Sequence, residues 1–359
     1  MTMSTRAVAA LGLSCLLTLA ACGGTPAASP SASGATAASA TQVAVTNCGA
    51  EVSYPAPVTR IHAHDSGIIS IVLATGAGSS LTSISSLDRD RATVARYYGT
   101  QDLDRVKDVA TSLPSLESLI ALNPQVVFAG WNYGFKEGGV TPDRLTANGI
   151  TPYLLTESCR PAAGQKQRGV MPPWDALRTD LANIGKITGH EKEAAAAIAD
   201  LDTRLAALQS APQAATKPSI LLFDSASDTV FTSGNKAGPQ AVIDAAGGVN
   251  VMADVDDSWT KVSWERVAQT RPDFIAFVEY GSQTFAEKVA LLESNPATKD
   301  LPAVKEKRFL NLPYTMWVSS PLNIPAAEQL RARLEQANLV PKSQLAAPKF
   351  DDHVAVSTT

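Results

Sequence analysis

The stretch Ser115-Leu-Glu-Ser-Leu-Ile-Ala-Leu-Asn-Pro-Gln-Val-Val-Phe-Ala129 aligns without gaps with Ser263-Trp-Glu-Arg-Val-Ala-Gln-Thr-Arg-Pro-Asp-Phe-Ile-Ala-Phe277. Each copy begins with Ser, a preferred N-cap residue, and places a Glu in the first helical turn, where the helix dipole favours a carboxylate. Each copy then has a Pro that ends the helix and an apolar run typical of a buried strand. The repeat predicts that one helix–strand unit occurs twice in the chain.

Outside the two copies, short apolar runs alternate with helical periodicity, as in α/β folds. The predicted strands are residues 58–63, 81–85, 125–129, 151–155, 219–223 and 274–278, and the predicted helices are 67–74, 115–122, 239–246, 264–269 and 285–292. Two further helices, 174–188 and 191–209, carry apolar residues on one face and lie between the copies. The pattern predicts an α/β fold of two lobes that are joined by a long helical connector.

The first 40 residues differ in composition from the rest. Arg6 precedes an apolar run, residues 7–21, which is too short to span a membrane and is typical of a signal peptide. The run ends in Leu19-Ala-Ala-Cys22, which resembles the lipobox of bacterial lipoproteins. We therefore expect a signal peptide (1–21), lipidation of Cys22, and a flexible leash (22–40) rich in Ala, Ser, Gly and Pro. A chance cysteine beside an ordinary cleavage site is the alternative.

The chain has four cysteines, and two of them lie in the predicted body. Cys15 would leave with the signal peptide, so Cys48 and Cys159 remain together in an oxidising compartment. A disulfide between them would contribute on the order of 4–5 kcal/mol to stability in the chain-entropy model. Two buried free thiols are the alternative, and a metal site is disfavoured because neither cysteine has a CxxC spacing.

Charge and motifs exclude several classes of function. The formal net charge of -4 and the lack of a Lys/Arg block argue against a nucleic-acid partner. The sequence contains no P-loop, no HExxH, no G-x-S-x-G elbow and no clear Rossmann glycine fingerprint. We therefore predict a protein that is not an enzyme and has no cofactor. A secreted enzyme of unknown type and a surface adhesin or scaffold are the alternatives from other classes.

The order and spacing of these features resemble the iron-siderophore and cobalamin class of substrate-binding proteins of ABC importers, the Fe/B12 periplasmic-binding domain family. The resemblance rests on the opening at residues 60–76, both copies of the repeat, the connector helix, and the closing segment Ala303-Val-Lys-Glu-Lys-Arg-Phe309. It implies an α/β fold of two Rossmann-like lobes that are joined by a single long rigid helix, with a ligand cleft between the lobes. The expected parts are an N-terminal lobe (41–188), a connector helix (190–211), a C-terminal lobe (217–339) and a polar tail (340–359).

The resemblance also implies a function. A monomer, held at the extracytoplasmic face of the cell membrane by its lipid, would capture a ferric siderophore and deliver it to an ABC importer permease and its ATPase. The segments Ala129-Gly-Trp-Asn-Tyr-Gly134 and Glu157-Ser-Cys are similar to an actinobacterial subgroup, some of whose members resemble importers of a deazaflavin coenzyme precursor. That precursor, cobalamin or another corrinoid, and heme are therefore the alternative ligands.

Ligands in such clefts meet the loops at the C-terminal ends of the strands. Aromatic rings suit a bulky planar or catecholate-type ligand, and arginine suits an anionic chelate. The predicted ligand-binding residues are His64, Arg91, Tyr98, Trp131, Asn132, Tyr133, Trp259, Tyr280 and Trp317. Ordinary packing is the alternative for each aromatic. His62 and His64 alternate onto one face of a strand end, but no further ligands converge on them in the sequence, so no metal site is predicted.

Members of the family dock on arginines of the permease through one surface glutamate in each lobe, and by position these would be Glu117 and Glu265. Two carboxylates on separate rigid lobes can each form a charge-assisted, bidentate pair with an arginine. Helix capping alone is the alternative explanation for both glutamates.

Overall fold

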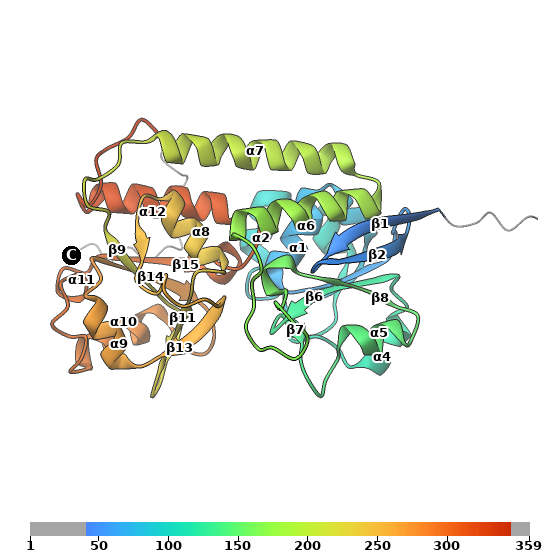
Figure 1. Ribbon diagram of the computed structural model, residues 1–359, viewed down its shortest axis with the longest axis horizontal. Coiled ribbons are helices and arrows are strands. Elements are labelled where there is room, and N and C mark those ends of the chain that lie inside the picture. The colour runs from blue at the N-terminus through green and yellow to red at the C-terminus, as the bar shows by residue number, and fades with distance from the viewer. Residues whose placement is uncertain (1–40, 346–359) are drawn as a thin grey trace, which may run out of the picture. The chain divides into compact units, whose positions relative to one another are not determined.

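Two parallel β-sheets organise the part of the chain that the computed structural model describes, residues 41–345 (Figure 1). The predicted signal peptide, the predicted lipidation site Cys22, the predicted leash and the end of the predicted polar tail lie outside these residues. We call residues 41–188 the first half and residues 217–339 the second half. No helix in the described range is long and apolar enough to cross a membrane.

The first half contains a six-stranded parallel sheet in the order β5-β4-β3-β6-β7, with β8 beside β6. Its strands are β3 (Ile61–His64), β4 (Leu81–Ser85), β5 (Lys107–Asp108), β6 (Val126–Trp131), β7 (Gly134–Phe135) and β8 (Thr151–Leu154). Its helices are α1 (Ser66–Ala74), α2 (Arg91–Tyr98), α3 (Gln101–Arg105), α4 (Leu116–Leu122) and α5 (Pro142–Thr146), with the 3₁₀ helices η1 (Ala77–Ser80) and η2 (Thr156–Ser158). Every residue of β3 is buried, as expected for a parallel strand that is covered on both faces.

The second half contains a four-stranded parallel sheet in the order β12-β9-β14-β15, and beside it the antiparallel strands β10-β11-β13. The strands are β9 (Ser219–Phe223), β10 (Ser225–Ala226), β11 (Val230–Ser233), β12 (Val249–Asn250), β13 (Trp259–Val262), β14 (Phe274–Glu279) and β15 (Phe309–Pro313). The helices are α8 (Gly238–Ala245), α9 (Trp264–Thr270), α10 (Phe285–Ser294), α11 (Pro302–Lys305) and α12 (Asn323–Gln336), with the 3₁₀ helix η3 (Tyr314–Met316). The α/β fold class is confirmed, but neither α12 nor the antiparallel strands were among the predicted elements.

The repeat folds as predicted, into α4 followed by β6 and α9 followed by β14. Ser115 and Ser263 each accept a hydrogen bond from the backbone N–H three residues further on, at 3.2 Å in both copies. Both helices end on a residue with left-handed backbone, Asn123 (φ 51°) and Arg271 (φ 42°), directly before the proline. The same local signals therefore produce the same unit in both halves.

Two long helices lie between the sheets in the sequence, α6 (Pro173–Thr188) and α7 (Glu191–Ser210). Helix α7 contacts α6 and α1 in the first half and α8 and α12 in the second half. It is not the only link, because α6 also contacts α8 and η3 contacts α1. The halves therefore meet along several elements, and the predicted lobe boundaries and single-helix connection stay predictions.

A disulfide joins Cys48 to Cys159, with 5.2 Å between the Cα atoms. Cys48 lies in the turn of the hairpin formed by β1 (Gln42–Asn47) and β2 (Ala50–Pro55), and Cys159 directly follows η2. Beside the bond, Asn47 exchanges two hydrogen bonds of 2.8 Å with the backbone of Leu154 at the end of β8. The predicted disulfide is confirmed, and the alternative of two free thiols is excluded.

Replacing both bridged residues, by Cys48→Ser with Cys159→Ser, should lower the unfolding temperature by several degrees. The open chain loses a cross-link that contributes on the order of 4 kcal/mol through the entropy of the unfolded state. Thermal unfolding followed by circular dichroism measures the change, and each single Ser variant should lose about as much as the double variant. An unchanged unfolding temperature would contradict this role of the bond.

Asp180 ties α6 to the end of β8 and is fully buried. Its carboxyl accepts hydrogen bonds from the Tyr153 hydroxyl at 2.9 Å, the Thr156 hydroxyl at 2.5 Å and the Thr156 N–H at 3.1 Å. Burial raises the pKa of Asp180 to about 7, although these hydrogen bonds act in the opposite direction. The folded protein therefore holds a proton here that the unfolded chain releases at a lower pH.

Because the pKa of this carboxyl is higher in the folded state, its contribution to the free energy of unfolding should fall as the pH rises from about 4 to about 7. The substitution Asp180→Asn should flatten that fall. Urea unfolding at pH 5, 6, 7 and 8 measures both proteins. Parallel pH curves for the two proteins would show that Asp180 is ionised throughout.

Candidate functional site

A cavity of about 410 Å³ lies between the two halves. It is lined by Arg89, Asp90, Ala92 and Thr93 of the first half and by Glu279, Tyr280, Gly281, Ser282, Gln283, Thr284, Asn311 and Pro313 of the second half. These residues lie in or next to the segments that follow β4, β14 and β15, at the C-terminal edges of both parallel sheets. Open α/β sheets bind ligands at this edge. The volume falls within the range of about 300–1,000 Å³ usual for small-molecule sites.

Arg89 brings a positive charge against two aromatic rings at this cavity. Its guanidinium carbon lies 4.4 Å from the centre of the Tyr280 ring and 5.1 Å from that of Tyr314, and the two rings lie 4.6 Å apart. The Nε of Arg89 is 3.4 Å from the Asp90 carboxylate. Tyr280 is 36% exposed and lines the cavity. A cation beside aromatic faces suits a ligand with anionic oxygens and planar groups.

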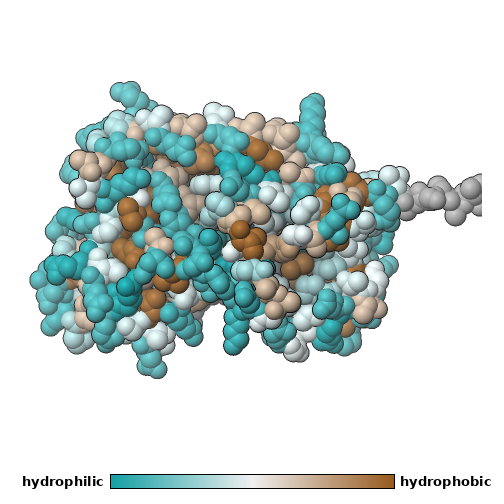
Figure 2. All heavy atoms as spheres, viewed as in Figure 1, coloured by the Kyte–Doolittle hydropathy of each residue, from teal (hydrophilic) through white to brown (hydrophobic). Residues whose placement is uncertain are grey.

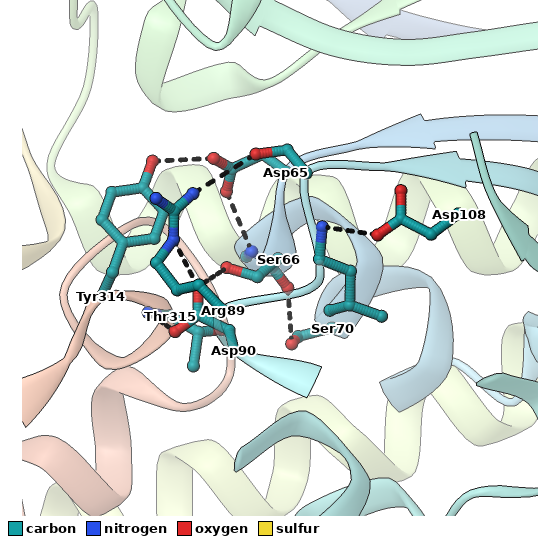
Figure 3. Close-up of polar contacts among 11 residues, drawn as sticks. Asp65, Ser66, Ser70, Arg89, Asp90, Asp108, Tyr314 and Thr315 are labelled. Carbon is teal, nitrogen blue, oxygen red and sulfur yellow. Dashed lines mark hydrogen bonds and ion pairs between the residues drawn. The ribbon is translucent and has the colours of Figure 1, made fainter. Parts of the chain in front are cut away.

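Hydrogen bonds on either side of Arg89 join the two halves (Figure 3). The Tyr314 hydroxyl donates to Asp65 over 2.7 Å, and the Thr315 N–H donates to Asp90 over 3.3 Å. Asp90 also accepts from the Ser66 hydroxyl at 2.8 Å. Burial raises the pKa of Asp65 to about 7, and it raises the pKa of Asp90 as well, although the hydrogen bonds lower both. Buried carboxyl groups of the first half thus form part of the contact with the second half.

A third buried carboxyl, that of Glu157 in η2, makes a similar contact. It accepts from the Tyr133 hydroxyl at 2.8 Å and from the Gly238 N–H of the second half at 3.1 Å. Burial raises the pKa of Glu157 to about 7. Position 238 requires glycine because the backbone of Trp317, also in the second half, lies close to it. A Cβ atom at this position would be 2.5 Å from the Trp317 carbonyl oxygen.

The segment after the disulfide also reaches the second half. Arg168 donates from its guanidinium to the carbonyl oxygen of Trp259 at 2.6 Å and from its N–H to Asp257 at 3.1 Å. Gln167 donates to the Asp256 carboxylate at 2.8 Å. The two halves are therefore linked by polar contacts on several segments in addition to α7.

Of the nine predicted ligand-binding residues, Tyr280 lines the cavity. Three others are buried and engaged elsewhere. The His64 ring is 2.8 Å from the Ser85 hydroxyl, the Tyr133 hydroxyl binds Glu157, and the Trp317 indole donates to the carbonyl oxygen of Phe277 at 3.1 Å. Trp317 is fully buried, so in this structure it packs in the core.

The remaining five lie apart from the cavity lining. Trp131 is half-buried with the Arg160 guanidinium 3.6 Å from its ring centre, and Asn132 beside it is exposed. Trp259 is buried against Phe231. Arg91 donates to the carbonyl oxygen of Leu103, and Tyr98 lines a separate cavity beside α7. The structure does not bring these side chains together, and their roles stay predictions.

The structure also places Arg89 and Asn311 in the cavity lining, and neither was among the predicted ligand-binding residues. In the sequence, Arg89 lies close to other charged residues, a pattern that fits a solvated surface equally well. The signal that could have distinguished it is its place in the segment that follows a predicted strand, 81–85. Asn311 lies within β15, which was not a predicted strand.

Glu117 and Glu265 are both exposed in the first turns of α4 and α9. These two helices lie on the side of the molecule away from α7 (Figure 1). Hydrogen bonds with the helix N-terminus and with the N-cap serine lower the pKa of both carboxyls. Both glutamates therefore present a negative charge on one side of the protein.

Metal-binding side chains do not cluster in residues 41–345, where no three His, Cys, Asp or Glu residues could hold an ion together. The His62 ring nitrogens lie 2.8 Å and 3.1 Å from the hydroxyls of Ser83 and Ser85.

On the face shown in Figure 2, hydrophilic residues dominate and apolar residues form small separate groups.

Solved structures share this fold. A periplasmic binding protein from Veillonella parvula is 19% identical and has a TM-score of 0.68, and the match covers 82% of this chain and 98% of that one. An ABC-type Fe3+-hydroxamate transport protein from Saccharomonospora viridis is 22% identical, with a TM-score of 0.63 and coverage of 81% and 98%. The vitamin B12 binding protein of Vibrio cholerae is 20% identical, with a TM-score of 0.57 and coverage of 79% and 98%.

No curated protein matches the sequence significantly. The model of the family described as periplasmic binding protein matches residues 61–315, which is more than half of the chain. The matched range runs from the first strand of the first sheet into η3, and it contains the cavity lining and the contacts between the halves. The chain therefore belongs to the periplasmic binding protein family, whose members bind solutes outside the cytoplasm.

Proposed function

We propose that this protein is the lipid-anchored substrate-binding component of an ABC importer, and that it captures a ferric siderophore in the cavity between its halves and delivers it to the permease. The observation that carries the proposal is the position of Arg89 against Tyr280 and Tyr314 at that cavity. A ferric siderophore presents anionic oxygens around the metal and is bulky. A guanidinium can donate several hydrogen bonds to such oxygens, and the rings can pack against its flat surfaces.

The surrounding lining supports a ligand of mixed polarity. Asn311 and Gln283 add amide groups, while Thr93 and Ser282 add hydroxyls. The Oδ1 atom of Asn311 is buried and has no hydrogen-bond partner among the described residues. A buried amide oxygen without a partner lowers stability, so a ligand that supplies a donor here gains binding energy. The iron would arrive already chelated, since the described side chains offer no metal cluster of their own.

Delivery to a permease is supported by the two exposed glutamates. Glu117 and Glu265 occupy equivalent positions in two copies of one unit, one in each half. A partner with two arginines at matching positions would therefore contact both halves together. A lipid on Cys22 would keep the protein close to that partner in the membrane and raise its effective concentration there.

Arg89→Gln should weaken binding of a ferric siderophore at least tenfold, because a hydrogen bond to a charged group contributes about 1.5–3 kcal/mol. Tryptophan fluorescence titration with ferric hydroxamate and ferric catecholate siderophores measures the affinity, with heme, cobalamin and the deazaflavin precursor as competing candidates. Arg178→Gln on α6 is the control for loss of one positive charge, because Arg178 pairs with Asp175 and Asp202 and does not line the cavity.

Binding of heme, cobalamin or the deazaflavin precursor in place of every siderophore would overturn the proposed ligand. Siderophore binding that Arg89→Gln leaves unchanged would instead place the ligand outside this cavity.

Glu117→Arg combined with Glu265→Arg should abolish siderophore uptake by cells while ligand affinity stays unchanged, because both charges that face the permease arginines are reversed. Uptake of a radiolabelled ferric siderophore measures transport. The matched control is Glu191→Arg with Glu193→Arg, which reverses two exposed first-turn charges on α7, the helix on the other side of the molecule (Figure 1). Normal uptake by the Glu117 and Glu265 double variant would rule out this docking mode.

A further inference from the structure

Three carboxyl groups of the first half, those of Asp65, Asp90 and Glu157, are buried against the second half, and two of them, Asp65 and Glu157, have no salt bridge among the described residues. Asp65 is 5% exposed and accepts from the Tyr314 hydroxyl, and Glu157 is 1% exposed and accepts from the Gly238 N–H. Both donors belong to the second half, so separation of the halves would break both hydrogen bonds and expose both carboxyls to water. The protonation state of these two groups and the distance between the halves are therefore physically linked.

Neither carboxyl has a salt bridge among the described residues. The charged and titratable groups around them are His62, His64, Arg89, Asp90, Tyr133, Arg168, Asp180 and Tyr314. Burial lowers the pKa of His62 to about 3 and that of His64 to about 4, so both imidazoles are neutral above pH 5.

The two arginines nearby are paired with other carboxylates, Arg89 with Asp90 at 3.4 Å and Arg168 with Asp257 at 3.5 Å. Each carboxyl accepts two hydrogen bonds, Asp65 from the Tyr314 hydroxyl and the Gly67 N–H, and Glu157 from the Tyr133 hydroxyl and the Gly238 N–H. These bonds and the nearby arginines favour the ionised forms, but burial outweighs them. Burying a carboxylate without an ion-pair partner is unfavourable, and such a group takes up a proton instead.

We propose that the two halves close on protonated Asp65 and Glu157, and that opening the cleft releases these protons, so that a rise in pH favours the open form. Solvent exposure removes the desolvation that disfavours the charged carboxylate, so each group ionises once the halves separate. Asp90 lies beside Asp65, and its negative charge raises the pKa of Asp65. Two ionised carboxylates side by side repel each other, so ionisation of Asp90 also favours the open form.

The direction of the pH effect follows from the pKa values. We call the arrangement in this structure, with the halves in contact, the closed form. In it the pKa of both Asp65 and Glu157 is about 7, while exposed carboxyls ionise near pH 4. The closed form therefore binds more protons between about pH 4 and pH 7, and it loses its advantage as the pH rises through that range. Each pKa unit of difference changes the ratio of open to closed protein about tenfold for each group.

Hydrogen exchange at two backbone amides can measure whether the contact between the halves opens as the pH rises. The Gly238 N–H donates to Glu157 across the contact, whereas the Thr156 N–H donates to Asp180 within the first half. Hydrogen exchange of the purified protein, corrected for the intrinsic effect of pH, should show that protection of the Gly238 amide falls at least tenfold from pH 5 to pH 8. Protection of the Thr156 amide should fall by a smaller factor.

The variant Asp65→Asn with Glu157→Gln cannot ionise at either position and should remove the pH dependence at Gly238. Asp180→Asn is the matched control, since this carboxyl is equally buried and has a similar pKa, but its hydrogen-bond partners lie within the first half. It should leave the pH dependence at Gly238 intact.

An unchanged pH dependence in the double variant would overturn the proposal. If the double variant does not fold, the original protein and Asp180→Asn still decide. Equal pH dependence at Gly238 and Thr156 in the original protein, or its loss in Asp180→Asn, would then overturn the proposal.

Discussion

The burial of first-half carboxyls against the second half is the constraint on which the site depends. The buried Asp65 carboxyl accepts a hydrogen bond from the Tyr314 hydroxyl of the second half, and the buried Glu157 carboxyl accepts one from the Gly238 N–H. These hydrogen bonds fix the spacing of the two sheet edges. That spacing brings Arg89, which follows a first-half strand, against the Tyr280 ring, which follows a second-half strand. The binding chemistry of the cavity is therefore a product of the contact between the halves.

The disulfide helps to position Glu157, one of the carboxyls in this contact. Cys159 is two residues after Glu157, and its bond to Cys48 ties η2 to the hairpin of the first half. The carboxyl of Glu157 is thus held at a fixed position while the second half supplies its donor. Long helices act on a larger scale, because α7 contacts elements of both halves. The disulfide fixes η2 within the first half, and α7 together with the polar contacts holds the two halves against each other.

Features that depend on residues close together in the sequence could be predicted from it. The repeat carries its own N-cap serine and its own proline stop, so both helix–strand units were found, and the pairing of Cys48 with Cys159 was predicted by exclusion of the other cysteines. Helix α12 was missed because residues such as Gln329 and Arg331 are buried in it and obscure an apolar face. The cavity lining was mostly missed, since Arg89 gains its role from rings that lie far away in the sequence. These polar residues form a cavity lining only because the two halves of the fold bring them together.

Hydrogen exchange measured by mass spectrometry with and without a ferric siderophore tests the central claim, that ligand binds between the halves. The account predicts slower exchange in two separate segments, 88–93 of the first half and 279–284 of the second half, because both line the cavity. Protection limited to one half, or protection near Tyr98 and residues 321–325 beside α7 in place of the cavity segments, would contradict it.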